Sequence, residues 1–205
     1  MSTLELEKEL WEFGHEYVAC CDEVGRGCLF GSVLAASVIL PKDLYIEGVK
    51  DSKKCTPKKR EELYEIIKEK AIAIGVGTVS AKVIDEINIK NATRLAMKKA
   101  VINLKDQDGN KITPDFLLID AEEIDIKIPQ KAIIKGDDTS HGIAAASIVA
   151  KVIRDRMCLK WEEEYPIYGI AQHKGYGTKL HKEALLTHGP SDLHRMSFLK
   201  KILAV

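Results

Sequence analysis

Short apolar runs alternate with stretches of helical periodicity along the chain, and this alternation predicts an α/β fold. The runs are rich in Val, Ile, Leu and Ala and are bounded by polar turns, as β-strands usually are. They span residues 17–22, 33–40, 72–80, 116–119 and 132–134. Glu23-Val24-Gly25-Arg26-Gly27, a turn-forming stretch, separates the first two runs, so we expect these two strands to pair.

Helix signals lie between and after these runs. Thr56-Pro57 is typical of an N-cap followed by the first helical residue. Residues 92–104 and 143–164 predict two further helices, and Pro166 ends the second of them. Strands interleaved with helices predict a mixed sheet flanked by helices, followed here by a short helical C-terminal segment. No stretch is rich enough in Pro, Gly or Ser to be a linker, so we expect a single domain over residues 1–205.

The balance of charge limits which partners the chain can hold. Lys and Arg total 31, and Asp and Glu total 31, so the formal net charge is zero. Attraction of the whole molecule to nucleic acid or to a membrane is therefore excluded, and such a partner must be held by a local patch. The hydrophobic content of 45% is typical of a globular chain. No apolar run approaches the roughly 20 residues of a membrane span, so we expect no membrane partner.

The cysteines and the N-terminal residues indicate a compartment. Five cysteines are an odd number, and they contain no Cys-x-x-Cys pair, which argues against a disulfide framework and a structural zinc site. Residues 1–16 are acidic and lack an uninterrupted apolar core, so we expect no signal or transit peptide. Both observations favour a cytoplasmic location.

Three of the predicted strands are followed by carboxylates. Asp22-Glu23 ends the first run, Asp120 follows residues 116–119, and Asp137-Asp138 comes after residues 132–134. Each signal alone is more typical of a polar turn or a helix cap. Together they repeat one pattern, and neighbouring strand ends could collect them into a metal site. Carboxylate oxygens suit Mg²⁺ or Mn²⁺ rather than zinc, and several of them could hold two such ions.

Two further segments could bind phosphates. Lys53 and Lys54 lie in a basic run, residues 50–60, which is either a solvated face or a phosphate-binding strip. His173-Lys174-Gly175-Tyr176 places an aromatic ring among cationic or protonatable groups, which suits stacking on a sugar or base with phosphates nearby. The alternative for this second segment is a Gly-rich surface loop with a half-buried tyrosine.

A glycine-rich turn follows the first acidic pair. Gly25-Arg26-Gly27 could bring backbone N–H groups close to a ligand, because glycine has no side chain in the way. The turn is not a dinucleotide fingerprint, since the third glycine and the helix after it are missing. The chain also lacks Gly-x-x-x-x-Gly-Lys-[Ser/Thr] and His-Glu-x-x-His, so neither a nucleotide phosphate loop nor that zinc motif is present.

Six motifs, taken in order, resemble those of the bacterial ribonuclease HII family, the type 2 ribonucleases H. They are Asp22-Glu23-Val24-Gly25-Arg26-Gly27, Asp51-Ser52-Lys53-Lys54, Leu118-Ile119-Asp120, Lys135-Gly136-Asp137, Ala144-Ala145-Ala146-Ser147-Ile148-Val149-Ala150-Lys151 and His173-Lys174-Gly175-Tyr176-Gly177-Thr178. The resemblance extends from about residue 16 to residue 198, which is nearly the whole chain. Six motifs in one fixed order are a specific signal.

The resemblance implies a ribonuclease H-like fold and a metal-dependent endonuclease. Its substrates would be the RNA strand of RNA–DNA hybrids and single ribonucleotides embedded in duplex DNA, cut to leave 3′-hydroxyl and 5′-phosphate ends. Two Mg²⁺ or Mn²⁺ ions would be held by four carboxylates: Asp22, Glu23, Asp120 and Asp137. The family's Lys-Gly-Asp pattern selects Asp137 over Asp138.

The resemblance also implies a substrate-binding set and partners. Gly25, Arg26 and Gly27 would contact the ribonucleotide around the scissile phosphate, and Tyr176 would stack on the sugar of the next nucleotide. The remaining expected substrate-binding residues are Lys53, Lys54, His173 and Lys174. We expect the protein to be a monomer, with a sliding clamp as a further partner.

One segment departs from the family pattern, and two other functions remain as alternatives. Members usually have Gly-Pro-Leu-Ala-Gly-Pro where this chain has Gly27-Cys28-Leu29-Phe30-Gly31-Ser32, so two prolines are missing and Phe30 is larger than the usual residue. The alternatives are another nuclease or recombinase of the same fold, and a catalytically dead hybrid-binding protein. The Gly-Arg-Gly and His-Lys-Gly-Tyr segments argue against the first, and retention of all four carboxylates argues against the second.

Overall fold

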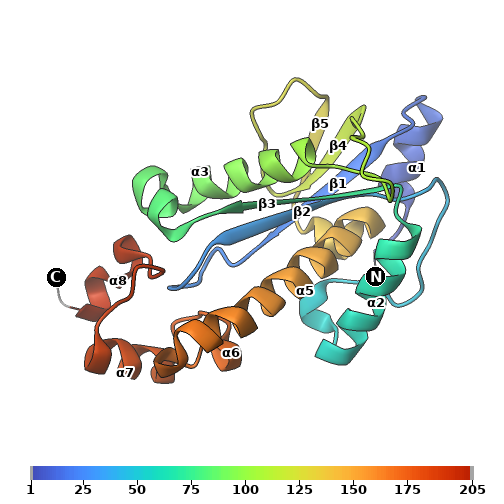
Figure 1. Ribbon diagram of the computed structural model, residues 1–205. Coiled ribbons are helices and arrows are strands. Elements are labelled where there is room, and N and C mark those ends of the chain that lie inside the picture. Colours follow the sequence, from blue (N-terminus) through green and yellow to red (C-terminus); the bar gives the residue numbers. More distant parts are fainter. Residues whose placement is uncertain (1, 204–205) are drawn as a thin grey trace.

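A five-stranded mixed sheet forms the centre of the molecule, with helices on both faces (Figure 1). The computed structural model describes residues 2–203. The strands are β1 (Val18–Val24), β2 (Val33–Ile39), β3 (Ala73–Val79), β4 (Phe116–Asp120) and β5 (Gln130–Ile133), in the order β3-β2-β1-β4-β5. β2 runs antiparallel to both β1 and β3, whereas β4 pairs parallel with both β1 and β5. The predicted fold class is confirmed.

The helices divide between the two faces of the sheet and one end of the molecule. They are α1 (Glu5–Glu12), α2 (Pro57–Lys70), α3 (Ala81–Ile102), α4 (Gly136–Thr139), α5 (His141–Glu164), α6 (Ile170–His173), α7 (Lys179–His188) and α8 (Met196–Leu203). Figure 1 shows α3 along one face and α5 along the other, with α2 beside α5 and with α6, α7 and α8 gathered at one end. This C-terminal segment follows the predicted break at Pro166.

Alternate residues of β1 face two different hydrophobic cores, because successive strand side chains point to opposite faces. Ala19 and Cys21 lie in the core between the sheet and α3. Cys20 lies on the opposite face, packed with Leu10 of α1 and Ile143 of α5. This alternation puts Asp22 on the α5 face and Glu23 on the α3 face. All five cysteines are buried and free.

The predicted strands are found with small shifts in their bounds. β1 continues past the predicted residues 17–22, so Asp22 and Glu23 are paired strand residues opposite Ala36 and Ala35. The interpretation of these two acids as a turn after the strand is therefore wrong. β5 begins and ends earlier than the predicted residues 132–134, since the chain turns away before Ile134, whose side chain is 82% exposed.

The helices differ more from prediction. α3 begins at Ala81, well before the predicted residue 92, and its backbone is non-helical at Asn88, where φ is 67°. The side chain of Asn88 accepts a hydrogen bond from the Asn91 N–H at 3.1 Å, so it caps a second helical half that corresponds to the prediction. The short acidic helix α1 gave no strong sequence signal.

Local caps explain why two other helices begin where they do. Thr56 accepts a hydrogen bond from the Lys59 N–H, and Pro57 is the first residue of α2, as predicted. Ser140 accepts one from the Ile143 N–H and starts α5. None of the helices within residues 2–203 has both the length and the apolar character of a membrane span. That residues 1–205 form one catalytic domain stays a prediction.

Candidate active site

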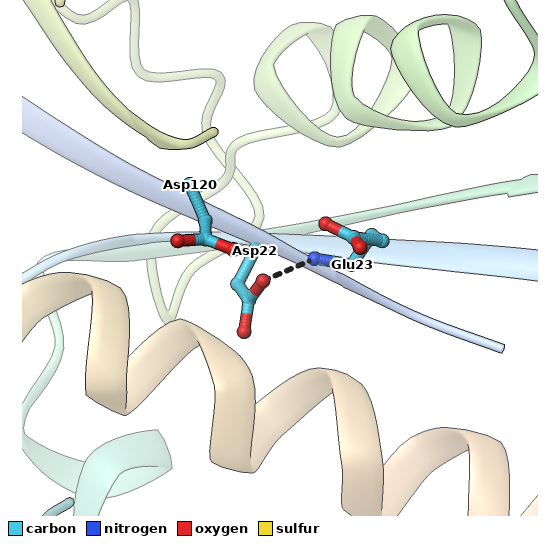
Figure 2. Close-up of side chains that lie close together, drawn as sticks. All are labelled: Asp22, Glu23 and Asp120. Atoms are coloured by element: carbon cyan, nitrogen blue, oxygen red, sulfur yellow. Dashed lines mark hydrogen bonds between the residues drawn. The ribbon is translucent and has the colours of Figure 1, made fainter. Parts of the chain in front are cut away.

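Three carboxylates meet near the C-terminal ends of two neighbouring strands. Because β1 and β4 are parallel and adjacent, their C-terminal ends share one edge of the sheet. One oxygen of each of Asp22, Glu23 and Asp120 lies within 4.8 Å of those of the other two. Figure 2 shows the Asp22 carboxylate directed toward α5, with its Oδ1 accepting a hydrogen bond from the Glu23 N–H at 2.8 Å. The sheet therefore brings together three of the four predicted carboxylates.

These three carboxylates repel one another. Burial, and then the charges of Glu23 and Asp120, raise the pKa of Asp22 well above its usual range. Burial also raises the pKa of Asp120, although the Gly136 N–H, which donates to its Oδ1 at 2.6 Å, opposes the shift. A cation between the carboxylates would relieve the repulsion, and their oxygen donors fit Mg²⁺ or Mn²⁺. The cluster thus has the donor chemistry of a divalent-metal site.

The fourth predicted carboxylate, Asp137, lies in α4 beside this cluster. Its side chain is mostly buried, and its charge adds to burial in raising the pKa of Asp120. The neighbouring Asp138 is partly exposed and forms an ion pair with Lys54. The two acids therefore have different surroundings: the charge of Asp137 acts on Asp22 and Asp120, whereas Asp138 pairs with Lys54 at the surface. This geometry favours Asp137 over Asp138 as the fourth member of the site.

Arg26 lies between two carboxylates in the loop after β1. Its Nη1 is 3.3 Å from Glu122 Oε1 and 3.7 Å from Glu23 Oε1. Glu122 is buried, and Arg94 of α3 holds its other oxygen, with Nε 2.9 Å from Oε2. Burial raises the pKa of Glu23, and the charge of Arg26 opposes this shift. No sequence pattern pointed to Glu122 or Arg94.

Two fully buried arginines hold the loop of residues 25–27 from inside. Arg195 donates from Nη1 to the Arg26 carbonyl at 2.8 Å. Arg154 lies directly against Gly25, where an added Cβ would be 2.3 Å from its Nε and where φ is 89°. Only glycine fits at this position, both for space and for backbone conformation. Neither arginine is among the residues predicted from the sequence.

The predicted lysines approach the site from a separate 3₁₀ turn, Ser52–Lys54. Its N-cap Asp51 accepts a hydrogen bond from the Lys53 N–H at 2.9 Å. Lys53 Nζ lies 3.5 Å from Asp137 Oδ2, and 80% of its side chain is exposed. Although burial lowers the pKa of Lys53, the charges of Asp51 and Asp137 outweigh it and raise the pKa. A charged, exposed ammonium beside the carboxylates is available to a phosphate.

Tyr176 borders the loop of residues 25–27. Its ring is 43% exposed, and a Cβ added at Gly27 would lie 3.8 Å from the ring atom Cε1. Lys174, two residues earlier, adopts a left-handed conformation with φ of 55°, and its carbonyl accepts a hydrogen bond from Arg154 Nη1 at 2.8 Å. The ring of Tyr176 thus lies next to Gly27, in the loop that follows Asp22 and Glu23.

His173 is bonded through both of its ring nitrogens to backbone groups. Its ring is buried, Nε2 donates to the Tyr168 carbonyl at 2.7 Å, and Nδ1 accepts from the Gly175 N–H at 3.2 Å. Both ring nitrogens are therefore occupied by backbone groups. That His173 takes part in substrate binding stays a prediction, and in the free protein the ring holds the backbone of its own loop.

The segment that departs from the family pattern is rigidly packed. Phe30 is fully buried, and its ring meets the rings of Trp161, Tyr165 and His194 edge to face, with centroids 5.7, 5.6 and 4.8 Å apart. Cys28 donates to the Lys174 carbonyl, with Sγ 3.4 Å from the oxygen. Aromatic packing thus supports the loop where other members have proline.

The sequence and the fold are both similar to those of ribonucleases of one family. The family model for Ribonuclease HII matches residues 19–201. A ribonuclease HII of Alkaliphilus oremlandii is 71% identical over 203 residues, which cover 99% of this chain and 100% of that protein. Ribonuclease H2 from Pyrococcus horikoshii OT3 superimposes with a TM-score of 0.73 at 25% identity, covering 91% of this chain and 97% of that one. A chain of the PCNA:RNase HII complex from Archaeoglobus fulgidus gives 0.69 at 25% identity, covering 88% and 94%.

Proposed function

The chain belongs to the ribonuclease HII family, and from this membership we propose that it cuts both RNA–DNA hybrids and duplex DNA at single embedded ribonucleotides. It is an endoribonuclease of the ribonuclease H type that acts on RNA–DNA hybrids. The finer proposal concerns isolated ribonucleotides and product ends, which we expect to be a 3′-hydroxyl and a 5′-phosphate. The observation that carries it is the exposed ring of Tyr176 next to Gly27, in the loop that follows the carboxylates Asp22 and Glu23.

The four carboxylates are proposed to hold the divalent cations, Mg²⁺ or Mn²⁺. Asp22, Glu23 and Asp120 supply oxygens close enough to share ions, and Asp137 lies beside them. A pair of such cations, when bound, lowers the pKa of the attacking water and stabilises the leaving oxygen. The protein then needs no histidine base, which agrees with a site in which the nearest motif histidine, His173, is occupied by backbone groups.

Residues 25–27 are proposed to read the ribonucleotide, because a protein tells RNA from DNA by the 2′-hydroxyl. Gly27 is exposed, whereas Gly25 is buried against Arg154. Arg195 and Arg154 fix the loop, so its backbone needs no reordering when substrate binds. Tyr176 is proposed to pack on the following sugar. A deoxyribose there admits a close ring, whereas a 2′-hydroxyl would crowd it.

The test is cleavage of a DNA duplex with one embedded ribonucleotide, compared with a continuous RNA–DNA hybrid. We expect cleavage of both with Mg²⁺ or Mn²⁺, none with chelator, and none with Asp120→Asn, which should still bind the duplex. Tyr176→Ala should slow the isolated site about tenfold to a hundredfold, as loss of stacking worth roughly 1–3 kcal/mol would, and Tyr176→Phe much less. Intact embedded ribonucleotides beside a cleaved hybrid would refute the finer proposal.

Partners and location are also proposals. The Archaeoglobus fulgidus neighbour is a chain of a complex with PCNA, which supports a contact of this protein with a sliding clamp. We further propose that the protein is a monomer and cytoplasmic, in line with the sequence expectations.

A further inference from the structure

A chain of hydrogen bonds through two buried histidines ends on the backbone of Tyr176. His194 Nε2 lies 3.1 Å from His181 Nε2, and His181 Nδ1 lies 2.9 Å from the Tyr176 carbonyl oxygen. At the other end, the Ser191 N–H donates to His194 Nδ1 at 2.9 Å. Both rings are almost fully buried, at 0% and 2% exposure. These hydrogen bonds therefore connect the segment before α8 with the loop that carries Tyr176.

The direction of every proton in this chain follows from its first bond. A backbone N–H can only donate, so His194 Nδ1 accepts and the proton of the neutral ring is on Nε2. That proton is donated to His181 Nε2, which places the proton of His181 on Nδ1. The Nδ1–H then donates to the Tyr176 carbonyl. One neutral tautomer of each ring satisfies all three hydrogen bonds. If both rings were charged, the Nε2–H groups of His181 and His194 would point at each other and no hydrogen bond could form between them.

Neutral rings are what this environment favours. Burial lowers the pKa of His181 to about 4 and that of His194 to about 4. Phe30 packs edge to face on His194 at 4.8 Å, and His173 stacks on His181 at 4.4 Å. The hydrogen-bond chain is therefore intact at neutral pH.

The backbone before Tyr176 is held in the same way. His173 Nδ1 accepts the Gly175 N–H, and the Gly175 carbonyl accepts the Leu29 N–H at 2.8 Å. On the other side, His181 donates a hydrogen bond to the carbonyl of Tyr176. Histidines therefore bind the backbone on both sides of Tyr176, while its ring is partly exposed.

We propose that His181 and His194 are positioning residues: they fix the backbone of Tyr176 so that its ring stands ready beside the scissile junction. The ring position is then set without the substrate, which reduces the ordering that binding would otherwise require. The proposal rests on the proposed role of Tyr176 in reading single ribonucleotides. Both histidines lie behind Tyr176 in the buried part of this segment, so we expect their effect on cleavage to act through Tyr176.

Paired amide substitutions test this proposal. The Asn side-chain nitrogen lies near the position of histidine Nδ1, and the Gln nitrogen lies near that of Nε2. His181→Asn can still donate to the Tyr176 carbonyl, whereas His181→Gln cannot. At the other ring the order reverses: His194→Gln can still donate to His181, whereas His194→Asn cannot. A purely space-filling role would not produce this crossed pattern.

Two measurements are made on each variant. The first is amide hydrogen exchange of residues 174–178 in the free protein. We expect about fivefold faster exchange in His181→Gln and His194→Asn, equivalent to losing one hydrogen bond of ordinary strength, and a change below about twofold in the other two. The second is the ratio of cleavage rates on the embedded ribonucleotide and the continuous hybrid, which should fall about fivefold in the same two variants.

The two measurements separate the two ideas. Equal exchange in all four variants and wild type, or a pattern that is not crossed, overturns the positioning role. Crossed exchange supports it, even where thermal unfolding shows that one variant is less stable, since the His194 pair repeats the test. Crossed exchange with an unchanged rate ratio, together with an unchanged ratio in Tyr176→Ala, supports the positioning role and refutes the junction-reading role of Tyr176.

Discussion

A single glycine connects two of the four carboxylates. The Gly136 N–H donates to Asp120 Oδ1 at 2.6 Å, and Asp137 is the next residue along the chain. A Cβ at Gly136 would lie 2.6 Å from Ile143 Cδ1 and 3.1 Å from Asp120 Oδ1, so no side chain fits there without displacing the carboxylate. The Lys-Gly-Asp pattern therefore has a physical reason: the glycine lets the loop approach β4 closely enough to bring Asp137 beside Asp120.

Replacing each of the two adjacent acids in this loop should have very different effects. Asp137→Asn removes a charge from the mostly buried cluster, and we expect a loss of cleavage rate on the order of 10²–10³, as for other electrostatic groups of a preorganised site. Asp138→Asn removes only a surface partner of Lys54, and its rate should stay within about twofold of wild type. Steady-state cleavage of a hybrid in Mg²⁺ measures both. The reverse ranking would move the fourth ligand to Asp138.

At the scale of elements, the 3₁₀ turn Ser52–Lys54 carries two exposed lysines that we expect to contact substrate phosphates. Phosphate contacts release counterions, so we expect Lys53→Ala/Lys54→Ala to reduce the slope of log affinity against log salt by about 0.7–0.9 per lost contact. Lys68→Ala/Lys70→Ala at the far end of α2 removes the same charge and should leave the slope unchanged. Affinity is measured by titration of a labelled hybrid with chelator present. Equal slopes of log affinity against log salt in the two double variants would indicate that the basic run is a solvated face and does not bind phosphates.

The N-terminal helix α1 holds the junction between α4 and α5. Glu7 Oε1 accepts hydrogen bonds from Ser140 Oγ at 2.6 Å and from the Gly142 N–H at 2.8 Å. Thr3 pairs with the same junction through its backbone, accepting from the His141 N–H at 2.9 Å. Because α4 carries Asp137, this short acidic helix contributes to the placement of a site residue that is far from it in sequence.

Removing the Glu7 side chain should therefore destabilise the protein. Glu7→Ala leaves two buried donors without an acceptor, which typically costs about 1–3 kcal/mol of unfolding free energy each. Glu7→Gln keeps an acceptor oxygen and should lose less. Glu9→Ala, an exposed acid of the same helix, is the control and should stay near wild type. Urea unfolding followed by circular dichroism gives the free energies, and equal values for the Glu7→Ala and Glu9→Ala variants would exclude this role.

Across the whole molecule, the sequence predicted what local patterns encode and missed what the fold brings together. The strands follow from the apolar runs, and the resemblance to the family selects four carboxylates, three of which the sheet brings together. Glu122, by contrast, reaches Arg26 only because β1 and β4 are adjacent strands, and the two residues lie in the loops that follow them. Arg154 left one usable signal, a charge on the apolar stripe of a predicted helix, whereas the partners of Arg195 are more than 160 residues away in the sequence and are brought to it by the fold.

The acidic cluster should also lower the stability of the metal-free molecule. The pKa values of Asp22 and Asp120 are raised, first by burial and then by neighbouring carboxylates. In the pH range above the usual carboxyl value of about 4, the folded protein holds protons that the unfolded chain releases. The free energy of unfolding therefore falls as the pH rises through the raised pKa values, and the loss is complete above them.

Asp22→Asn should consequently stabilise the metal-free protein while abolishing cleavage. The Asn oxygen can still accept from the Glu23 N–H, so the substitution removes charge without an obvious loss of packing. We expect a gain of about 0.5–2 kcal/mol at pH 7.5, typical of relieving strain at a functional site, or a few degrees in Tm for a chain of this size. The gain should shrink toward pH 4, where wild-type Asp22 is protonated. Asp138→Asn is the control: the pKa of Asp138 is lowered, first by the hydrogen bond from Lys54, so neutralising this acid should give no gain in stability.

Added Mg²⁺ should raise the Tm of wild type more than that of Asp22→Asn, because ligand binding stabilises only a folded state that can hold the ion. Thermal unfolding in chelator and in Mg²⁺, at both pH values, measures all of these differences. A metal-free Asp22→Asn protein less stable than wild type at pH 7.5 would show that this carboxylate contributes packing or hydrogen bonding worth more than the repulsion it causes.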